Sequence, residues 1–257
     1  MITTLARFAV FGTCMVVALV ASPAAQAAPL SNDCSNALLT GNYGFSVNGT
    51  LNNSPTTSVG QIATNGNGTI SGTETISENG VLGEDLSVLG NYSIEPNCTG
   101  TMTIQAEGRS PQNFAITVIP DGKQINMIEI DTGTTQLGTA EAQSLNSCSA
   151  AGIKGLYNLQ AAGEKVGVGP LVFGGGVSSH GDGTLDGTAT VSIDGVIFSS
   201  QRISGAFKIG KQCSGKAVLQ VGSQGPIHLN LIVVNAGHEV LFIETDANTL
   251  LSGSLQR

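Results

Sequence analysis

The chain contains the same glycine-rich phrase twice, and this duplication is the feature that most constrains its fold. GNGTISGTETISENG occupies residues 66–80 and GDGTLDGTATVSIDG residues 181–195, with eight identical positions in fifteen. The correspondence continues downstream at a constant offset of 115 residues. Upstream the offset is 114, which pairs Tyr43 with Tyr157. Self-similarity over this length indicates two tandem copies of one domain.

The first 27 residues have the three-part layout of a secretory signal peptide. A leader with one charge precedes the apolar run FAVFGTCMVVALVA and a small-residue tail that ends at Ala27, as in exported precursors. The uncharged run is shorter than the ~20 residues that span a bilayer. We therefore expect cleavage after residues 1–27, a first repeat over 28–145, a second over 146–257, and a secreted or periplasmic protein without a membrane partner.

Four cysteines follow the leader, two in each copy. Cys34 and Cys98 are separated by 64 residues, and Cys148 and Cys213 by 65. Four thiols allow three pairings, and the duplication favours one disulfide within each copy, Cys34 with Cys98 and Cys148 with Cys213. Such bonds persist in an oxidising compartment.

Short alternating segments bounded by turn residues predict strands throughout both copies. Met102, Ile104 and Ala106 alternate with polar residues, as in a strand with one buried face. Asn79-Gly80 and Asp194-Gly195 suit hairpin turns, because both central residues of a type I′ turn need positive φ. No convincing helical stripe follows the leader, and 35 glycines with only 11% charged residues suit strands and turns.

About eight or nine strands per copy, joined by short hairpins, predict a meander. An up-and-down barrel hides its sheet edges by closing on itself, whereas the alternative, a β-sandwich, needs a longer crossover than any connection here provides. We therefore expect an all-β protein of two tandem antiparallel barrels with about eight strands each. The repeated glycines are interpreted as barrel corners, since a phosphate-binding loop requires a helix to follow it.

Charge and composition exclude several partners. The formal net charge of −8 disfavours nucleic acid and anionic membranes, which bind through Lys and Arg. The chain has no tryptophan and only three tyrosines, too few for an aromatic platform. His180, His228 and His238 have no zinc-ligand spacing, so no metal or cofactor is expected. A Gly-x-Ser-x-Gly elbow is also lacking beyond the leader, which leaves a hydrolase unsupported.

The penultimate strand of each copy carries the candidate ligand-binding residues. These are Met127, Glu129 and Asp131 in the first copy, and Phe242, Glu244 and Asp246 in the second. Alternation places each set on one face. Turned inward, that face would offer an apolar floor with carboxylates near the barrel mouth, able to orient a ligand or transfer a proton. The alternative is that the aspartates bond to the backbone of the following turn, with the glutamates solvated or paired with an Arg.

Several motifs resemble a group of secreted bacterial β-rich domains with no assigned activity. They are GNYGF at residues 41–45, GNGTISGT at 66–73, GNYSI at 90–94 and FIETD at 242–246. By strand number and meander the copies are also similar to calycin-type barrels, which hold small apolar ligands and include isomerases such as allene oxide cyclase. No catalytic residue of that cyclase maps onto this chain, so none is assigned, and fold likeness alone does not confer function.

We therefore expect an exported small-ligand-binding or structural β-barrel protein, and the sequence leans against an enzyme. The ligand of a binding protein of this kind would be a small apolar molecule. The alternative is a barrel-type isomerase acting on a lipid-derived substrate, which requires the carboxylate face to border a cavity. Oligomeric state and the packing of the two repeats do not follow from the sequence.

Overall fold

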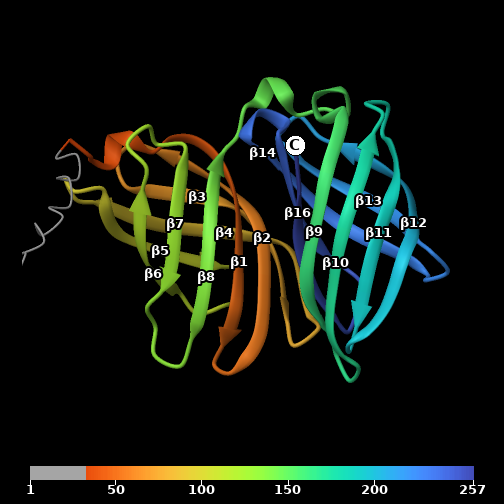
Figure 1. Ribbon diagram of the computed structural model, residues 1–257. Coiled ribbons are helices and arrows are strands. Elements are labelled where there is room, and N and C mark those ends of the chain that lie inside the picture. Colours follow the sequence, from red (N-terminus) through yellow and green to blue (C-terminus); the bar gives the residue numbers. More distant parts are fainter. Residues whose placement is uncertain (1–32) are drawn as a thin grey trace, which may run out of the picture.

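The computed structural model describes residues 33–257, which form two closed antiparallel β-barrels side by side (Figure 1). Each barrel has eight strands that pair in chain order until the first strand meets the last. The predicted fold is therefore confirmed, and the sandwich alternative does not form. The predicted signal peptide lies outside the described residues.

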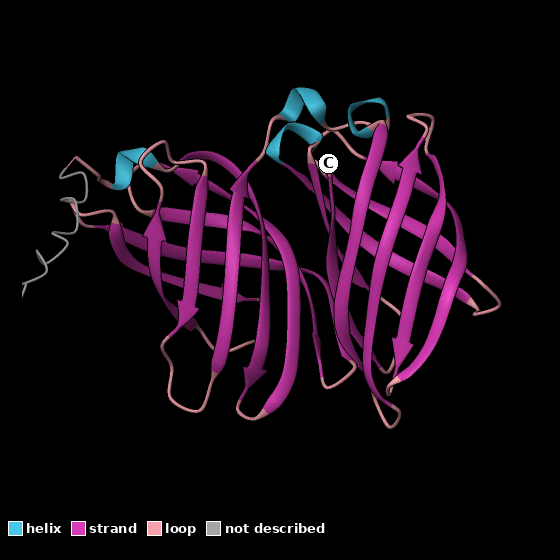
Figure 2. Cartoon of the chain, in the orientation of Figure 1, coloured by secondary structure: helices cyan, strands magenta, loops and turns pink. Residues whose placement is uncertain are grey.

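The strands of barrel 1 are β1 (Thr40–Leu51), β2 (Ser54–Asn65), β3 (Thr69–Glu78), β4 (Val81–Ile94), β5 (Thr99–Ala106), β6 (Gln112–Val118), β7 (Gln124–Glu129) and β8 (Thr135–Ala142). Those of barrel 2 are β9 (Gly155–Lys165), β10 (Gly169–Ser179), β11 (Thr184–Ile193), β12 (Val196–Ile209), β13 (Ser214–Val221), β14 (Pro226–Val234), β15 (Glu239–Glu244) and β16 (Thr249–Gln256). Four 3-10 turns lie at one end of the barrels (Figure 2): η1 (Asn36–Leu38), η2 (Leu145–Ser147), η3 (Ala151–Ile153) and η4 (Asn235–Gly237).

The hairpin turns form where the sequence predicts them. Asn79 and Asp194 adopt φ of 48° and 47°, and the glycines that follow them are also positive, as a type I′ turn requires. The repeated phrase itself is scaffold. A Cβ on Gly72 would lie 2.0 Å from the Gln61 carbonyl oxygen, and one on Gly187 would lie 2.2 Å from that of Gly176. Only glycine lets the neighbouring strand approach so closely.

Each barrel is filled by the inward-facing side chains of its own strands, which form a separate apolar core. A buried tyrosine on the first strand of each copy fixes a distant turn to this core. The Tyr43 hydroxyl donates to the Gly122 carbonyl oxygen at 2.7 Å, and the Tyr157 hydroxyl donates to that of Gly237 at 2.6 Å. The preference of a buried phenol for a hydrogen-bond partner explains why both copies keep the pair.

One disulfide lies within each barrel, as the duplication predicts. Cys34 is bonded to Cys98, and Cys148 to Cys213. Two disulfides indicate an oxidising environment.

An apolar contact joins the two barrels. Val59 on β2 packs against Ile232 and Val234 on β14 and against Leu241 and Ile243 on β15. This contact is heterologous, because it uses the β1–β3 side of barrel 1 and the β14–β16 side of barrel 2.

Hydrogen bonds reinforce the contact on both sides. The Asn230 amide donates to the Thr75 hydroxyl at 2.8 Å, and the Gln143 amide donates to the Val233 carbonyl oxygen at 2.9 Å.

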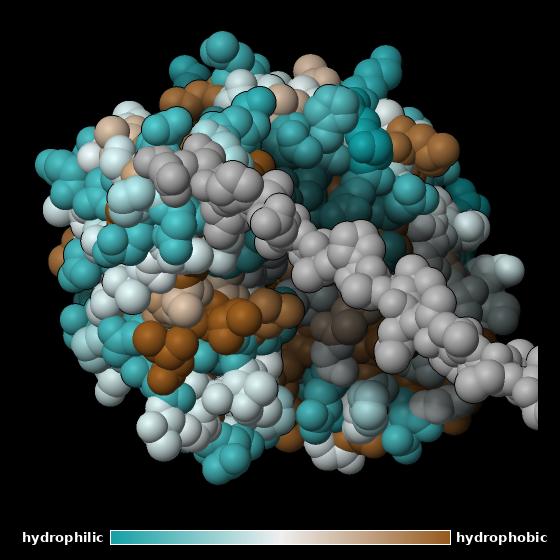
Figure 3. Space-filling view, turned by 60° about the vertical axis from the view of Figure 1, so that its left-hand side comes forward, coloured by the Kyte–Doolittle hydropathy of each residue, from teal (hydrophilic) through white to brown (hydrophobic). Residues whose placement is uncertain are grey.

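The face of the molecule in Figure 3 is largely hydrophilic, and its hydrophobic residues gather in small areas. This agrees with strands that turn alternate side chains outward. Within residues 33–257, none of the helices has the length and apolar character needed to cross a membrane.

The structure predicts separate contributions from the two disulfides. Replacing Cys34 and Cys98 together with serine should lower the free energy of unfolding by about 4 kcal/mol, because the unfolded chain regains loop entropy. The double replacement of Cys148 and Cys213 should act similarly on barrel 2. Denaturant titration of both variants, with non-reducing peptide mapping of the wild type, checks this. A Cys34–Cys148 peptide in the map would contradict it.

Candidate functional site

Four of the six predicted ligand-binding residues point into the barrels. Met127 and Phe242 belong to the two apolar cores. Glu129 and Glu244, one step further along the same faces, are each only 6% exposed. The glutamate side chains are therefore inward, as the binding hypothesis requires.

Asp131 and Asp246 instead join neighbouring strands. The carboxylate of Asp131 accepts hydrogen bonds from the backbone N–H and the side-chain amide of Asn113, at 2.8 and 2.9 Å. Asp246 accepts from the backbone N–H of His228 at 2.8 Å and contacts its Nδ1 at 2.7 Å. The predicted alternative, in which the aspartate side chains bond to the backbone of the following turn, is therefore wrong in its partner: both carboxylates bond to a neighbouring strand.

Burial is the main influence on the two inward glutamates. It raises the pKa of Glu244 to about 7, with Asp246 adding to the effect and Thr249 opposing it. The pKa of Glu129 is raised by burial as well, and the Gln112 amide opposes that rise. Desolvation disfavours the ionised form of a carboxyl group.

The interior of barrel 2 leaves a small apolar cavity of about 40 Å³, lined by residues that include Tyr157, Phe207 and Phe242. Pockets for drug-sized ligands measure about 300–1,000 Å³. Side chains therefore fill this barrel nearly completely, and Glu244 is not among the residues that line the cavity.

A larger hollow lies at the end of barrel 1 where Glu129 is found. It has a volume of about 520 Å³ and is lined by the β1–β2, β5–β6 and β7–β8 loops together with Glu78, Arg109, Gln112 and Glu129. We call it the barrel-1 mouth. Inside it, the Gln112 amide donates to Gln136 at 3.2 Å and reaches Glu129 at 3.5 Å.

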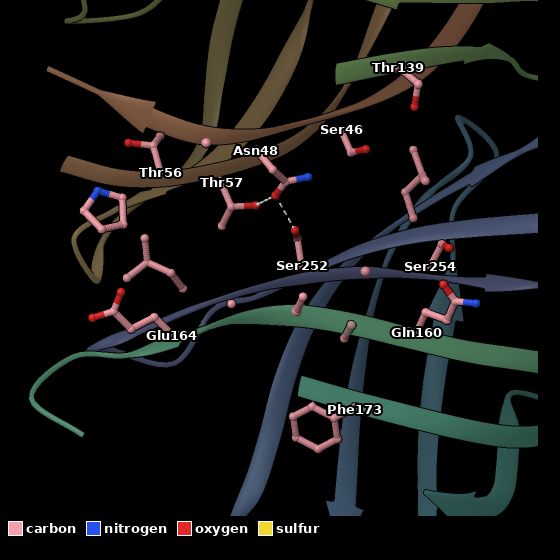
Figure 4. A pocket seen from close by; sticks show the side chains of 18 of the residues that line it. Ser46, Asn48, Thr56, Thr57, Thr139, Gln160, Glu164, Phe173, Ser252 and Ser254 are labelled. Atoms are coloured by element: carbon pink, nitrogen blue, oxygen red, sulfur yellow. Dashed lines mark hydrogen bonds between the residues drawn. The ribbon is translucent and has the colours of Figure 1, made fainter. Parts of the chain in front are cut away.

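The largest of these hollows is a groove of about 790 Å³ between the barrels (Figure 4). Uncharged polar side chains of β1, β2 and β8 line one side, and those of β9 and β16 line the other. We call this the inter-barrel groove. Its polar lining consists of Ser46, Asn48, Thr56, Thr57, Thr139, Gln160, Ser252 and Ser254, with the two carboxylates of Glu164 and Glu239.

Asn48 occupies the centre of the groove. Its amide oxygen accepts hydrogen bonds from the hydroxyls of Thr57 and Ser252, the latter at 2.6 Å. The bond from Ser252 connects the two barrels, and the bond from Thr57 lies within barrel 1. Together they fix the amide, whose nitrogen points away from Thr57 (Figure 4). The groove therefore presents rigid donors and acceptors at the junction.

The two carboxylates of the groove lie toward opposite ends. Glu164 lies opposite Leu250 and Glu239 opposite Gln256, and both partners are on β16. At a rise of about 3.3 Å per residue, these positions are roughly 20 Å apart. No lysine or arginine lines the described groove, so its fixed charge is negative.

The Glu239 carboxyl, which lines the groove, interacts with a carboxyl of the other barrel. Glu141 on β8 faces Glu239 on β15. Burial, followed by the neighbouring Glu239 carboxyl, raises the pKa of Glu141 to about 7. The Gln256 amide donates to Glu239 at 2.8 Å. Two carboxyl groups in contact cannot both ionise without repulsion.

Sequence reasoning located the inward glutamates but missed the groove. Each of its walls belongs to a different copy, so a pattern within one copy carries no sign of it. The outward Ser and Thr residues that line it look like ordinary solvent-facing positions.

Among residues 33–257, no group of three or more His, Cys, Asp and Glu side chains is arranged to hold a metal ion. Comparison of the chain with protein-family models and with curated proteins found no match.

The buried carboxyl groups predict that stability falls as pH rises. Glu74, Glu141 and Glu244 have pKa values raised to about 7, so the folded state binds more protons than the unfolded state between about pH 4.5 and 7. The free energy of unfolding should therefore decrease through this window.

Urea titrations between about pH 5 and 8 test this expectation. Glu141→Gln should flatten the decrease, because it removes one titrating carboxyl and its repulsion with Glu239, whereas the exposed Glu95→Gln should not. Stability that rises over the same window would contradict the assignment.

Proposed function

We propose that the protein is an exported binding module that holds an extended, polar peptide segment in the inter-barrel groove. The observation that supports this most directly is the groove itself: a hollow of about 790 Å³ lined by hydroxyl and amide side chains from both barrels. Its volume falls within the range of about 300–1,000 Å³ typical of ligand sites. Export is supported by the layout of residues 1–27 and by the two disulfides.

The chemistry of the lining favours a peptide. An extended backbone presents an N–H and a C=O in every residue, and hydroxyl and amide side chains can pair with both. A groove of roughly 20 Å accommodates about six extended residues. An aromatic stacking platform, which sugars would use, is not supported by a chain that lacks tryptophan.

Charge narrows the class of peptide. The charged residues that line the described groove are Glu164 and Glu239. Acidic groups toward both ends favour basic residues near the peptide termini and disfavour acidic segments. This arrangement combines the two functions expected from the sequence, because a rigid exported module that binds a peptide of another protein is both a binder and a structural element.

The small apolar ligand and the lipid isomerase have less support. Both require room inside a barrel, and the apolar cavity of barrel 2 measures about 40 Å³. The likeness to secreted bacterial domains of no assigned activity stays a prediction and adds no chemistry of its own.

Affinity selection from a random hexapeptide library, with retained peptides identified by mass spectrometry, tests the proposal. We expect enrichment of peptides rich in Ser, Thr, Asn and Gln with Lys or Arg toward the ends. Ser254→Trp should weaken binding of a selected peptide at least about tenfold, which corresponds to 1.4 kcal/mol, because the indole would fill the groove.

Ser71→Trp, on the outer face of β3 away from the groove, provides the matched control and should bind as the wild type does. Since the chain has no tryptophan, each introduced indole also reports on folding. Equal affinity in Ser254→Trp and Ser71→Trp, or no enrichment by the wild type, would rule out the groove as the site.

A further inference from the structure

The duplication supplies an internal comparison for the barrel-1 mouth. Both copies have a bulge at the same place, between Glu74 and Ile76 in β3 and between Ala189 and Val191 in β11, so their interior positions correspond. The polar residues Glu74, Gln112 and Gln136 of barrel 1 correspond to the apolar residues Ala189, Ile227 and Leu251 of barrel 2. Of these interior positions, only the one occupied by Glu129 and Glu244 has the same polar residue in both copies.

This comparison separates what the fold needs from what it does not. Ala189, Ile227 and Leu251 pack into the core of barrel 2, which closes with the same strand order as barrel 1. Glu74 and Gln136 are only 3% and 4% exposed. Burying such groups costs free energy unless hydrogen bonds compensate, so barrel 1 carries a polar interior that closure does not demand.

Hydrogen bonds within barrel 1 do not satisfy all of its buried polar atoms. One carboxyl oxygen of Glu129, Oε2, and one of Glu74, Oε1, are buried without a hydrogen-bond partner. The nearby Thr134 hydroxyl donates to the Asp131 carbonyl oxygen at 2.6 Å, so its single proton is already used. Glu129 itself lines the barrel-1 mouth, so this unpartnered acceptor belongs to a residue that borders a hollow large enough for a small molecule.

Glu74 belongs to the same interior. It pairs with Leu86 across β3 and β4, and Leu86 packs against the barrel-1 core. Directly paired residues point to one face of a sheet, so Glu74 also points inward. Burial raises its pKa to about 7, and the positive charge of Arg109, which lines the mouth, opposes that rise.

The charges around the mouth favour a cation. Glu78, Glu129 and Asp131 line it together with one guanidinium, that of Arg109. Arg109 is already engaged, because both its terminal nitrogens contact Glu78 Oε2, at 3.0 and 3.1 Å. A protonated primary amine brings three N–H donors and one positive charge, whereas a neutral alcohol brings one donor and no charge.

We propose that the barrel-1 mouth binds a small molecule carrying a protonated primary amine, with the ammonium group donating to Glu129 Oε2 and to the neighbouring Gln136. Glu74, which is buried in the same barrel and interacts electrostatically with Arg109, adds negative charge. A hydrogen bond from ammonium to a buried carboxylate is charge-assisted and stronger than a neutral one. The site lies within barrel 1 and is independent of the inter-barrel groove.

Calorimetric titration of the folded wild-type chain with 1,4-diaminobutane tests the proposal. Butane-1,4-diol, which has similar length and no charge, serves as the matched ligand control. At about pH 8, where the amine is protonated and carboxyl groups are mostly ionised, the diamine should bind and the diol should not. Affinity should weaken as the pH is lowered, because burial raises the pKa of Glu129 and its protonation removes the acceptor charge.

Substitutions at equivalent positions of the two copies test which residues bind the diamine. Glu129→Gln should weaken diamine binding at least about tenfold, while Glu244→Gln, the same change in barrel 2, should leave it unchanged. The double variant Gln112→Ile with Gln136→Leu gives barrel 1 the residues of barrel 2. It should lose binding and raise the thermal midpoint, since it removes one buried and one half-buried polar side chain where the second barrel is apolar.

Two results would overturn the proposal. One is equal diamine affinity in the wild type and Glu129→Gln, or no diamine binding by the wild type. The other is a lower thermal midpoint in the Gln112→Ile, Gln136→Leu variant together with unchanged affinity, which would make the polar interior a structural network. Ser254→Trp should bind diamine normally, so failure of the groove proposal and failure of this one are distinguishable.

Discussion

Closure of each sheet on itself is the constraint on which the rest of the structure depends. The pairing of β1 with β8 and of β9 with β16 leaves no open edge in either barrel, so every strand finds backbone partners within its own copy. Closure forces the strands to bend, and the glycines that the two copies share, together with the matching bulges, supply that bend. It also separates an inner face, which the core fills, from an outer face on which sequence can vary. The contact with the other barrel, the groove and the polar surface all consist of residues on that outer face.

The inner and outer faces have diverged differently between the copies. Inside, both retain the tyrosine-to-turn hydrogen bond and the inward glutamate, whereas barrel 1 adds buried polar groups where barrel 2 is apolar. A polar group without a partner is costly in a low-dielectric interior, so this asymmetry carries more information than the shared core. Outside, hydroxyl and amide side chains collect where the barrels meet, and they line a groove that neither barrel possesses alone.

Most of the fold could be predicted from the sequence, and much less of the sites. The offset of 115 residues, the cysteine spacing and the alternation around Met102 and Ile104 report local rules that hold within one copy. Alternation also identified Glu129 and Glu244, although it could not show that their faces turn inward. The strand partners of Asp131 and Asp246, and the meeting of Asn48 with Ser252, depend on packing between distant segments. The unpartnered Oε2 of Glu129 likewise depends on which acceptors the neighbouring donors bond to, and the sequence does not show this.

The heterologous contact between the barrels bears on whether such units could assemble without limit. A contact between two different surfaces leaves the complementary surface of each unit free, and repetition would then produce a ring or an open fibre. The register of β1 with β2 and of β9 with β10 equates Val59 with Gly174, and the constant offset equates Ile232 with Thr117 and Leu241 with Asn126. Three of the five apolar side chains that join the barrels therefore have a glycine or a polar residue at the equivalent position of the other barrel. The free faces of the two barrels therefore do not reproduce the apolar contact that joins them, which disfavours its repetition between copies of the chain.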